Sequence, residues 1–297
     1  MQKTNTKLSW VIMGLVTLLL LGTTAFGGGV FETKGTFERT LKVRGPVNLE
    51  ITTNSGDVTV VSGDDSEVHI KGTIHVNQGW IFGNSDSEAR IRAIQRNPPI
   101  DQNGDHIEIS PPKDEALARH VSIDYQVTVP SRTQLTSKSG SGDLAVRGIL
   151  GPVNASTGSG DLKLAELRGD VHIRTGSGDG DFSNLSGGHV VIESGSGDMQ
   201  FRDIRAELHV RTGSGDVKAQ GEPTGEWILS TGSGDVTLNL PGTGGFDLDA
   251  STDSGDIDTN LPITIQGKAG GKELTGQVRG GGHMIRLRTG SGDIRID

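Results

Sequence analysis

Hydrophobic and polar positions alternate along most of this chain, and a glycine-rich turn interrupts the alternation at regular intervals. Positions eight and six before each turn aspartate are mostly hydrophobic, and so are positions one and three after it. A period of two on both sides of a turn predicts two short strands, each with one face directed inward. The aspartates belong to Ser-Gly-Asp triplets at Asp57, Asp143, Asp161, Asp179, Asp198, Asp216, Asp235, Asp256 and Asp293.

The spacing of these aspartates predicts the fold class. From Asp143 onward the gaps are 18, 18, 19, 18, 19, 21 and 37 residues, and the last, about twice the others, predicts one degenerate coil around Leu274. A fixed period near 18 is typical of a solenoid, whose coils stack about 4.8 Å apart with parallel strands. We therefore predict an all-β protein, a parallel β-solenoid of the flattened β-roll type, with two strands per coil and right-handed winding.

The turn residues predict how each corner is held. The residue three before the aspartate is glycine at seven of nine sites, and Asn54 or Asp253 at the others. Because Asn and Asp tolerate positive φ, we expect a left-handed corner there. Thr or Ser four before the aspartate should form hydroxyl ladders, and the carboxylates should accept turn amides. Repulsion between carboxylates about 4.8 Å apart is about 0.9 kcal/mol in water, comparable to one hydrogen bond, so the column needs no cation.

The repeat is interrupted between Asp57 and Asp143. The segment SDSEARIRAIQRN (85–97) opens with a capping box at Ser85 and Glu88, carries Ile91 and Ile94, and stops before two prolines. It predicts one short inserted helix near the N-terminal end, which covers an apolar edge of the first coils. We accordingly expect N-terminal coils with this insertion over 30–136 and the regular TGSGD-repeat solenoid over 137–297.

Residues 1–29 have the features of an export signal. Lys3 and Lys7 precede an uncharged run over 8–26, and Ala25 and Gly27 are small enough for a cleavage site. The run is also close to the ~20 residues that cross a bilayer, so a cleaved signal peptide and an uncleaved N-terminal membrane anchor both fit. We expect an exported protein, in the periplasm, at the cell surface or extracellular, tethered to the cytoplasmic membrane in the second case.

The composition of the chain excludes some classes of binding partner and some covalent links. The chain of 297 residues has 46 glycines and 4% aromatic residues, which favours many turns around a thin aliphatic core. A net charge of −9 argues against nucleic acid as a partner. The chain has no cysteine, so it has neither a disulfide nor a lipid-attachment site.

Calcium binding is the sharpest alternative for the glycine-rich turns. Calcium β-rolls carry G-G-x-G-x-D in both turns of each coil. Here the aspartate directly follows the second glycine, and opposite corners such as VRGILGPV and EPTGEW have no repeated acid. Calcium takes six to eight oxygen ligands, so we predict neither a metal site nor a cofactor. If calcium does bind, its candidate ligands are Asp161, Asp179, Asp198, Asp216 and Asp235.

The sequence gives little support for transition-metal binding, nucleophilic catalysis, phosphate binding or sugar binding. His172 and His209 should lie two coils, about 9.6 Å, apart, too far to share a metal ion. The sequence contains no GxSxG elbow and no complete phosphate-binding loop. Asp179 and Asp181 form the one acidic doublet in the corner column, where we expect a bulge because Phe182 must still reach the core. Trp227, Phe182 and Phe201 fall on inward columns, which places them in the core and not on a sugar-binding surface.

Three stretches resemble a known family. They are VSIDYQVTVPSRTQLTSKSGSGDLAV from Val121, the iterated TGSGD coils, and LPITIQGKAGGKELTGQVRGGGHMIRLRTGSGDIRI near the C-terminus. With them the chain, over about residues 37–296, resembles the bacterial "putative adhesin" family of β-strand-repeat envelope proteins, a domain of unknown function. The resemblance implies a secreted or membrane-tethered β-solenoid with a role in the cell envelope, and it supplies no catalytic residues.

These observations predict a non-enzymatic, adhesin-like envelope protein whose rigid rod presents a polar surface to an unidentified envelope component. Two alternatives stay open: a calcium-dependent β-roll, and an enzyme acting on envelope polysaccharide. The chain ends at Asp297, directly after the inward residues Ile294 and Ile296. We expect this last coil to leave an unpaired strand edge, which favours end-to-end self-association.

Overall fold

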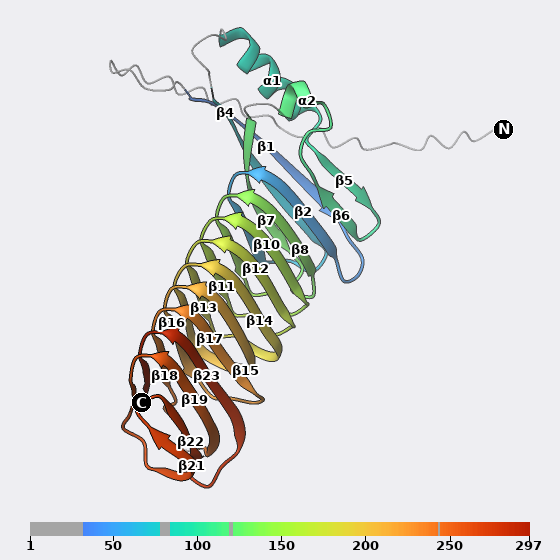
Figure 1. Cartoon of the computed structure of the whole chain (residues 1–297). Coiled ribbons are helices and arrows are strands. Elements are labelled where there is room, and N and C mark those ends of the chain that lie inside the picture. The colour runs from blue at the N-terminus through green and yellow to red at the C-terminus, as the bar shows by residue number, and fades with distance from the viewer. Residues whose placement is uncertain (1–31, 78–83, 119–120, 243) are drawn as a thin grey trace, which may run out of the picture.

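The computed structural model describes residues 32–77, 84–118, 121–242 and 244–297, and it has the shape of a rod built from two stacked sheets (Figure 1). The predicted signal or anchor segment lies outside the described residues. Within them, none of the helices is long and apolar enough to cross a bilayer.

Sheet A forms one side of the rod. Its strands are parallel from β7 to β20, whereas β4 is antiparallel to both β1 and β7. In spatial order, sheet A consists of β1 (Glu32–Lys42), β4 (Glu67–Asn77), β7 (Val121–Val129), β3 (Val58–Ser62), β9 (Leu144–Arg147), β11 (Leu162–Ala165), β13 (Gly180–Ser183), the first part of β15 (Met199–Ser214), β16 (Val217–Gly221), β18 (Val236–Asn239), β24 (Ile294–Ile296) and β20 (Ile257–Thr259).

Sheet B forms the other side. It is parallel from β6 to β19 and ends in antiparallel strands at both limits. In spatial order, sheet B consists of β5 (Ile100–Asn103), β6 (His106–Ile109), β2 (Asn48–Ser55), β8 (Gln134–Ser141), β10 (Val153–Ser159), β12 (Val171–Ser177), β14 (Ser186–Ser196), the second part of β15, β17 (Trp227–Ser233), β23 (His283–Ser291), β19 (Phe246–Ser254), β22 (Glu273–Val278) and β21 (Ile263–Gly270).

The inward positions stack in columns between the two sheets. Leu135, Val153 and Val171 occupy equivalent places on successive strands, and all three are fully buried. The same register continues through Val190, Leu208 and Trp227. Each strand thus buries every second side chain against the facing sheet, which is what period-two patterning requires. The predicted β-solenoid with two strands per coil is confirmed.

The acidic doublet at Asp179 and Asp181 involves no bulge, so that prediction was wrong. Gly180 stays in register between Leu162 and Met199. A Cβ at Gly180 would lie 2.5 Å from the Phe182 ring and 2.7 Å from the Met199 sulfur. Glycine therefore makes room for the rings of Phe182 and Phe201, which stack with centroids 4.7 Å apart. Both rings and Trp227 are buried, as their inward columns predicted.

A ladder of aspartates holds one corner of every coil. From the second ladder aspartate onward, the backbone N–H of each donates to the Oδ1 of the aspartate in the preceding coil of the stack, over 2.8–3.0 Å. The carboxylates thus accept turn amides, as expected. In spatial order, the ladder runs Asp124, Asp57, Asp143, Asp161, Asp179, Asp198, Asp216, Asp235, Asp293 and Asp256.

The hydroxyls beside the ladder also bond to turn carbonyls. Thr212 Oγ1 donates to the Ser214 carbonyl over 2.8 Å, and Thr157 makes the equivalent bond to Ser159 over 3.1 Å. The expected contribution of these hydroxyls to the tight turn is confirmed.

The left-handed residue of the corner is the glycine directly before each aspartate, and not the residue three before it as predicted. All nine such glycines have φ between 112° and 155°. The glycine three before the aspartate is needed for another reason: a Cβ at Gly213 would lie 2.5 Å from the carbonyl oxygen of Gly195 in the preceding coil. Asn54 escapes this clash because β2 pairs with β6 only as far as Ile51, and a small groove lies beyond it.

The C-terminal coils do not follow chain order. The predicted degenerate coil around Leu274 is wrong, because β21 and β22 form an antiparallel hairpin that pairs with β19. The final coil, β23 and β24, lies between β17 and β18 on one side and β19 and β20 on the other. Strand β24 is therefore paired on both sides, and the unpaired edge predicted there does not exist.

Two helices lie at the N-terminal end. Helix α1 (Asn84–Arg96) packs on β1 and β4 with Ile91 and Ile94 buried, as the insertion predicted. Gln95 Nε2 donates to the Thr36 carbonyl over 2.8 Å, which fixes the helix to the edge strand. The side chain of Ser85 lies outside the described residues, so the capping box stays a prediction. The four-residue helix α2 (Glu115–Ala118) was not predicted.

The ladder generates a matched pair of variants. Asp198 Oδ1 accepts the amide of Asp216, whereas Asp256 is the last ladder residue and its side chain accepts no ladder amide in the described part of the chain. We expect Asp198→Ala to lower the free energy of unfolding by about 1 kcal/mol and Asp256→Ala to leave it nearly unchanged. Asp198→Asn should recover most of the loss, since an amide oxygen still accepts. Urea unfolding measures all three, and equal losses for both alanine variants would contradict this role of the ladder.

Candidate functional site

The calcium candidates lie in one exposed column. Asp161, Asp179, Asp198, Asp216 and Asp235 occupy successive coils, one carboxylate per coil. One oxygen of each already accepts a backbone amide of the ladder. Across the described residues, no group of three or more His, Cys, Asp or Glu side chains is arranged to hold a metal ion. The column can present negative charge, but its carboxylates do not converge on a point.

A row of acids and histidines crosses the outer face of sheet B. Its members, which we call the His–carboxylate row, are Asp170, His189, Glu207, His209 and Glu226, with Arg286 at its end.

Glu207 links the two histidines of this row. Its Oε2 lies 3.5 Å from His189 Nε2, and its Oε1 lies 3.2 Å from His209 Nε2. Asp170 Oδ1 lies 3.5 Å from His189 Nδ1, and Glu226 Oε2 lies 4.0 Å from His209 Nε2. Arg286 pairs with the other oxygen of Glu226. Opposite charges therefore alternate across five coils when the histidines are protonated.

The sequence prediction missed this row. His172 and His209 share one column with Val191 between them, as predicted. His189 stands opposite Glu207 in a second column, two residues along the strand from the column of His209. The contacts of Glu226 with His209 and Arg286 run diagonally between the two columns. The signal was present nine residues before the turn aspartates, where Asp170, His189, Glu207 and Glu226 follow one another in four consecutive repeats.

Further ion pairs link neighbouring coils on the outer faces. Arg147 and Glu166 approach to 2.6 Å, and Arg174 and Glu193 to 2.7 Å. Hydrogen bonding to these guanidinium groups holds the pKa of each glutamate below its usual value. On sheet A, Arg202 pairs with Asp181, so the second acid of the doublet is engaged in a salt bridge. The outer surface is thus polar, with charges of both signs in fixed register.

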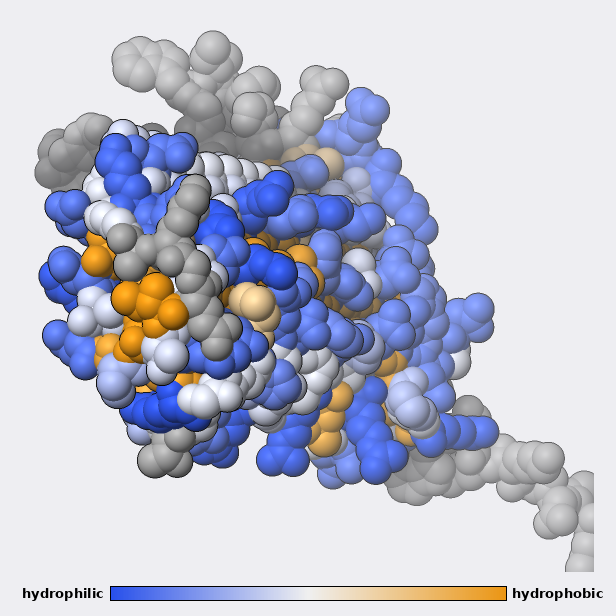
Figure 2. All heavy atoms as spheres, turned by 60° about the horizontal axis from the view of Figure 1, so that its bottom comes forward, coloured by the Kyte–Doolittle hydropathy of each residue, from blue (hydrophilic) through white to orange (hydrophobic). Residues whose placement is uncertain are grey.

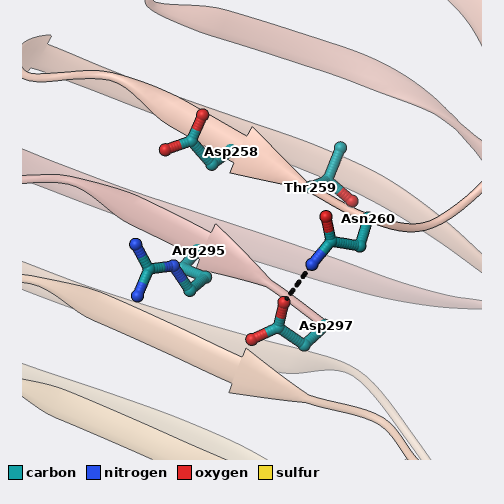
Figure 3. A pocket seen from close by; sticks show the side chains of 5 residues that line it. All are labelled: Asp258, Thr259, Asn260, Arg295 and Asp297. Atoms are coloured by element: carbon teal, nitrogen blue, oxygen red, sulfur yellow. Dashed lines mark hydrogen bonds between the residues drawn. The ribbon is translucent and has the colours of Figure 1, made fainter.

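A shallow polar depression lies at the C-terminal end of sheet A (Figure 3). Its lining residues are Asp258, Thr259, Asn260, Arg295 and Asp297. Asn260 Nδ2 donates to Asp297 Oδ1 over 2.9 Å, so one of its two carboxylates is already hydrogen-bonded. No aromatic side chain lines it. The residues can form hydrogen bonds with a polar partner, but the aromatic platform that sugar-binding sites commonly use is missing from this lining.

Comparisons with solved structures return proteins described as adhesins. The chain shares 14% identity with a putative cell adhesion protein from Clostridium sporogenes ATCC 15579, at a TM-score of 0.31, covering 88% of this chain and 99% of that one. A putative adhesin from Bacteroides fragilis NCTC 9343 shares 12% identity, at a TM-score of 0.35, with coverage of 89% and 98%. No curated protein matches the chain.

A family model matches most of the sequence. The model described as Toastrack DUF4097 aligns with residues 47–297, which include every strand from β2 to β24. The family resemblance carried by the three sequence stretches is thereby confirmed. The chain belongs to the Toastrack DUF4097 family, a β-solenoid domain of unknown function.

Proposed function

We propose that this protein is a non-enzymatic, exported component of the cell envelope, adhesin-like in action, which binds another envelope component through the outer face of sheet B. The observation that carries the proposal is the His–carboxylate row, because it is a continuous polar surface at fixed coil spacing. A partner with charged and hydrogen-bonding groups at a similar spacing would find complementary groups along the rod.

Sheet B supports this role better than sheet A. Its repeat strands are longer: β10 has seven residues, whereas β11 on sheet A has four. On the outward column of sheet B, Val191 lies between His172 and His209, and Ile228 lies between His209 and Arg286. Both apolar residues are half-buried. A polar surface with a few desolvated apolar positions is typical of a protein interface.

The absence of an enzymatic role is part of the proposal. The acids of the row are occupied by histidine or arginine partners in neighbouring coils. Burial raises the pKa of the Tyr125 phenol, beside the small groove at Asn54, so this phenol is an even weaker acid than an exposed tyrosine. Export rests on the pattern of residues 1–29, where Lys3 and Lys7 precede the uncharged run.

Binding can be tested by comparing the two faces. We expect the double variant His209→Ala, Ile228→Ala to reduce binding of the purified protein to native envelope fractions by about tenfold, equivalent to about 1.4 kcal/mol. The control is Lys163→Ala, Lys218→Ala on the outer face of sheet A, where both lysines are exposed. Co-sedimentation with the envelope fraction is the measurement. Equal binding by both double variants would reject sheet B as the binding face.

Export can be tested with a single cysteine, because the chain has none of its own. We expect Lys163→Cys, at an exposed position on the rod, to react with a membrane-impermeant maleimide in intact cells to the same extent as after lysis. A cysteine-bearing cytoplasmic protein is the control. Labelling that requires lysis of the cytoplasmic membrane would overturn the proposed location.

Calcium independence can be tested on the same protein. Since each ladder carboxylate bonds to an amide and the carboxylates do not converge, we expect no saturable heat on calcium titration and the same melting temperature with and without chelator. Saturable binding that raises the melting temperature and is lost in Asp198→Ala would instead support the calcium-dependent β-roll.

A further inference from the structure

The two sheets end at different levels at the C-terminal end of the rod. Sheet A stops at β20, whose partner among the described strands is β24. Sheet B continues beyond the matching strand β19 with β22 and β21 (Figure 1). We call the β21–β22 hairpin the overhang. Its inner face extends past the last strand of sheet A, so in the described part of the chain no second sheet lies opposite it.

The inner face of the overhang is apolar. Leu274 and Val278 of β22 stand opposite the inward residues Ala250 and Phe246 of β19, so they belong to the core side of sheet B. Ile263 and Ile265 of β21 stand opposite Val278 and Gly276 and continue the same face. Ile265 is 50% exposed, one of two large hydrophobic residues exposed in the described structure. Figure 2 shows hydrophobic residues gathered at this end and bordered by polar ones.

The N-terminal end is closed in a way that the C-terminal end is not. At the N-terminal end, sheet A extends beyond the first coil with β7, β4 and β1, and α1 packs against β1 and β4. Ile91 and Ile94 of this helix are 6% and 1% exposed, so the apolar face at that end is covered. On the overhang, Val278 is buried and Ile263 and Leu274 are half-buried against the core, but Ile265 has no such cover among the described residues.

We propose that the cover is a second copy of this chain, joined tail to tail about a twofold axis. Each copy has two strands of sheet B in excess and lacks the opposing strands of sheet A. When the overhang of one copy enters the space beyond β20 of the other copy, it takes the place of the missing strands of sheet A. By the twofold symmetry, the overhang of the second copy does the same for the first. Ile263 and Ile265 of both copies then meet in a closed interface. Head-to-tail stacking is disfavoured because α1 fills the corresponding space at the opposite end.

The rim of this end suits a symmetric contact. Arg295 lies beside Asp258 on adjacent strands, and Lys272 and Glu273 stand exposed on the overhang. A rim that carries both signs of charge can oppose plus to minus after a twofold rotation. The outer edges of β20 and β21 are unpaired in the described structure, and such edges readily accept a further strand. In the proposed dimer, β21 of one copy lies next to β20 of the other.

Sedimentation of the full chain in detergent tests the interface. We expect the wild-type protein to form a dimer and no larger species, and Ile265→Asp to weaken dimerisation by at least about tenfold, or about 1.4 kcal/mol. The control is Leu150→Asp, since Leu150 is the other large exposed hydrophobic residue (41%) and lies on the corner between β9 and β10. It should remain dimeric. Circular dichroism melting verifies that both variants fold.

Crosslinking gives a second measurement that does not depend on a disruptive substitution. Lys272→Cys places one exposed thiol at the tip of the β21–β22 hairpin, at the rim of the proposed interface, in a chain without cysteine. A bismaleimide should convert this variant into a covalent dimer, whereas Leu150→Cys should stay uncrosslinked at the same protein concentration. A monomeric wild-type protein, an Ile265→Asp variant that stays dimeric, or an extended series of oligomers would each overturn the proposal. Envelope binding through sheet B is measured separately and can fail or succeed independently.

Discussion

The hydrogen bond from a backbone amide to the carboxylate of the neighbouring coil is the interaction on which this rod depends. The bond places every corner in register with the next, because the donor and the acceptor sit at the same position of each repeat. The exposed carboxylates repel one another by about as much as a single hydrogen bond contributes, so the amide bonds offset the repulsion. The glycine before each aspartate is the conformational requirement of this arrangement, since its positive φ turns the aspartate amide toward the adjacent coil.

Because every coil presents the same donor and the same acceptor, the ladder does not distinguish one coil from another. The final coil can therefore dock on β17 and β18 while the coil that precedes it in sequence docks outside it. Asp293 lies between Asp235 and Asp256 in the ladder, and it makes the same amide–carboxylate hydrogen bonds as the other ladder residues. Chain order is set instead by the β21–β22 hairpin, whose strands pair antiparallel and return the chain toward the coil it has left.

These features separate what the sequence could predict from what it could not. Local alternation predicted the inward columns, since the burial of residues such as Leu208 and Trp227 depends on strand geometry alone. It could not predict the order of coils, because a gap of 37 residues fits either an extra coil or a hairpin. Gly180 was misjudged because its role is set by ring volume in the neighbouring coil. The His–carboxylate row was missed because the histidines were compared along the column of His172 and His209, whereas His189 lies in the neighbouring column with Glu207.

A uniform ladder cannot by itself recognise a particular partner, since it repeats the same groups along its whole length. Specific contacts must come from positions where the repeat varies. The outward columns of sheet B are one such place, where acids, histidines and apolar residues replace one another from coil to coil. The ends are the other, because there the stack has no further coil and the two sheets stop at different levels. The regular core thus stabilises the rod and sets its length. The side chains that can bind a particular partner lie on the outward columns of sheet B and at the ends, where the repeat varies.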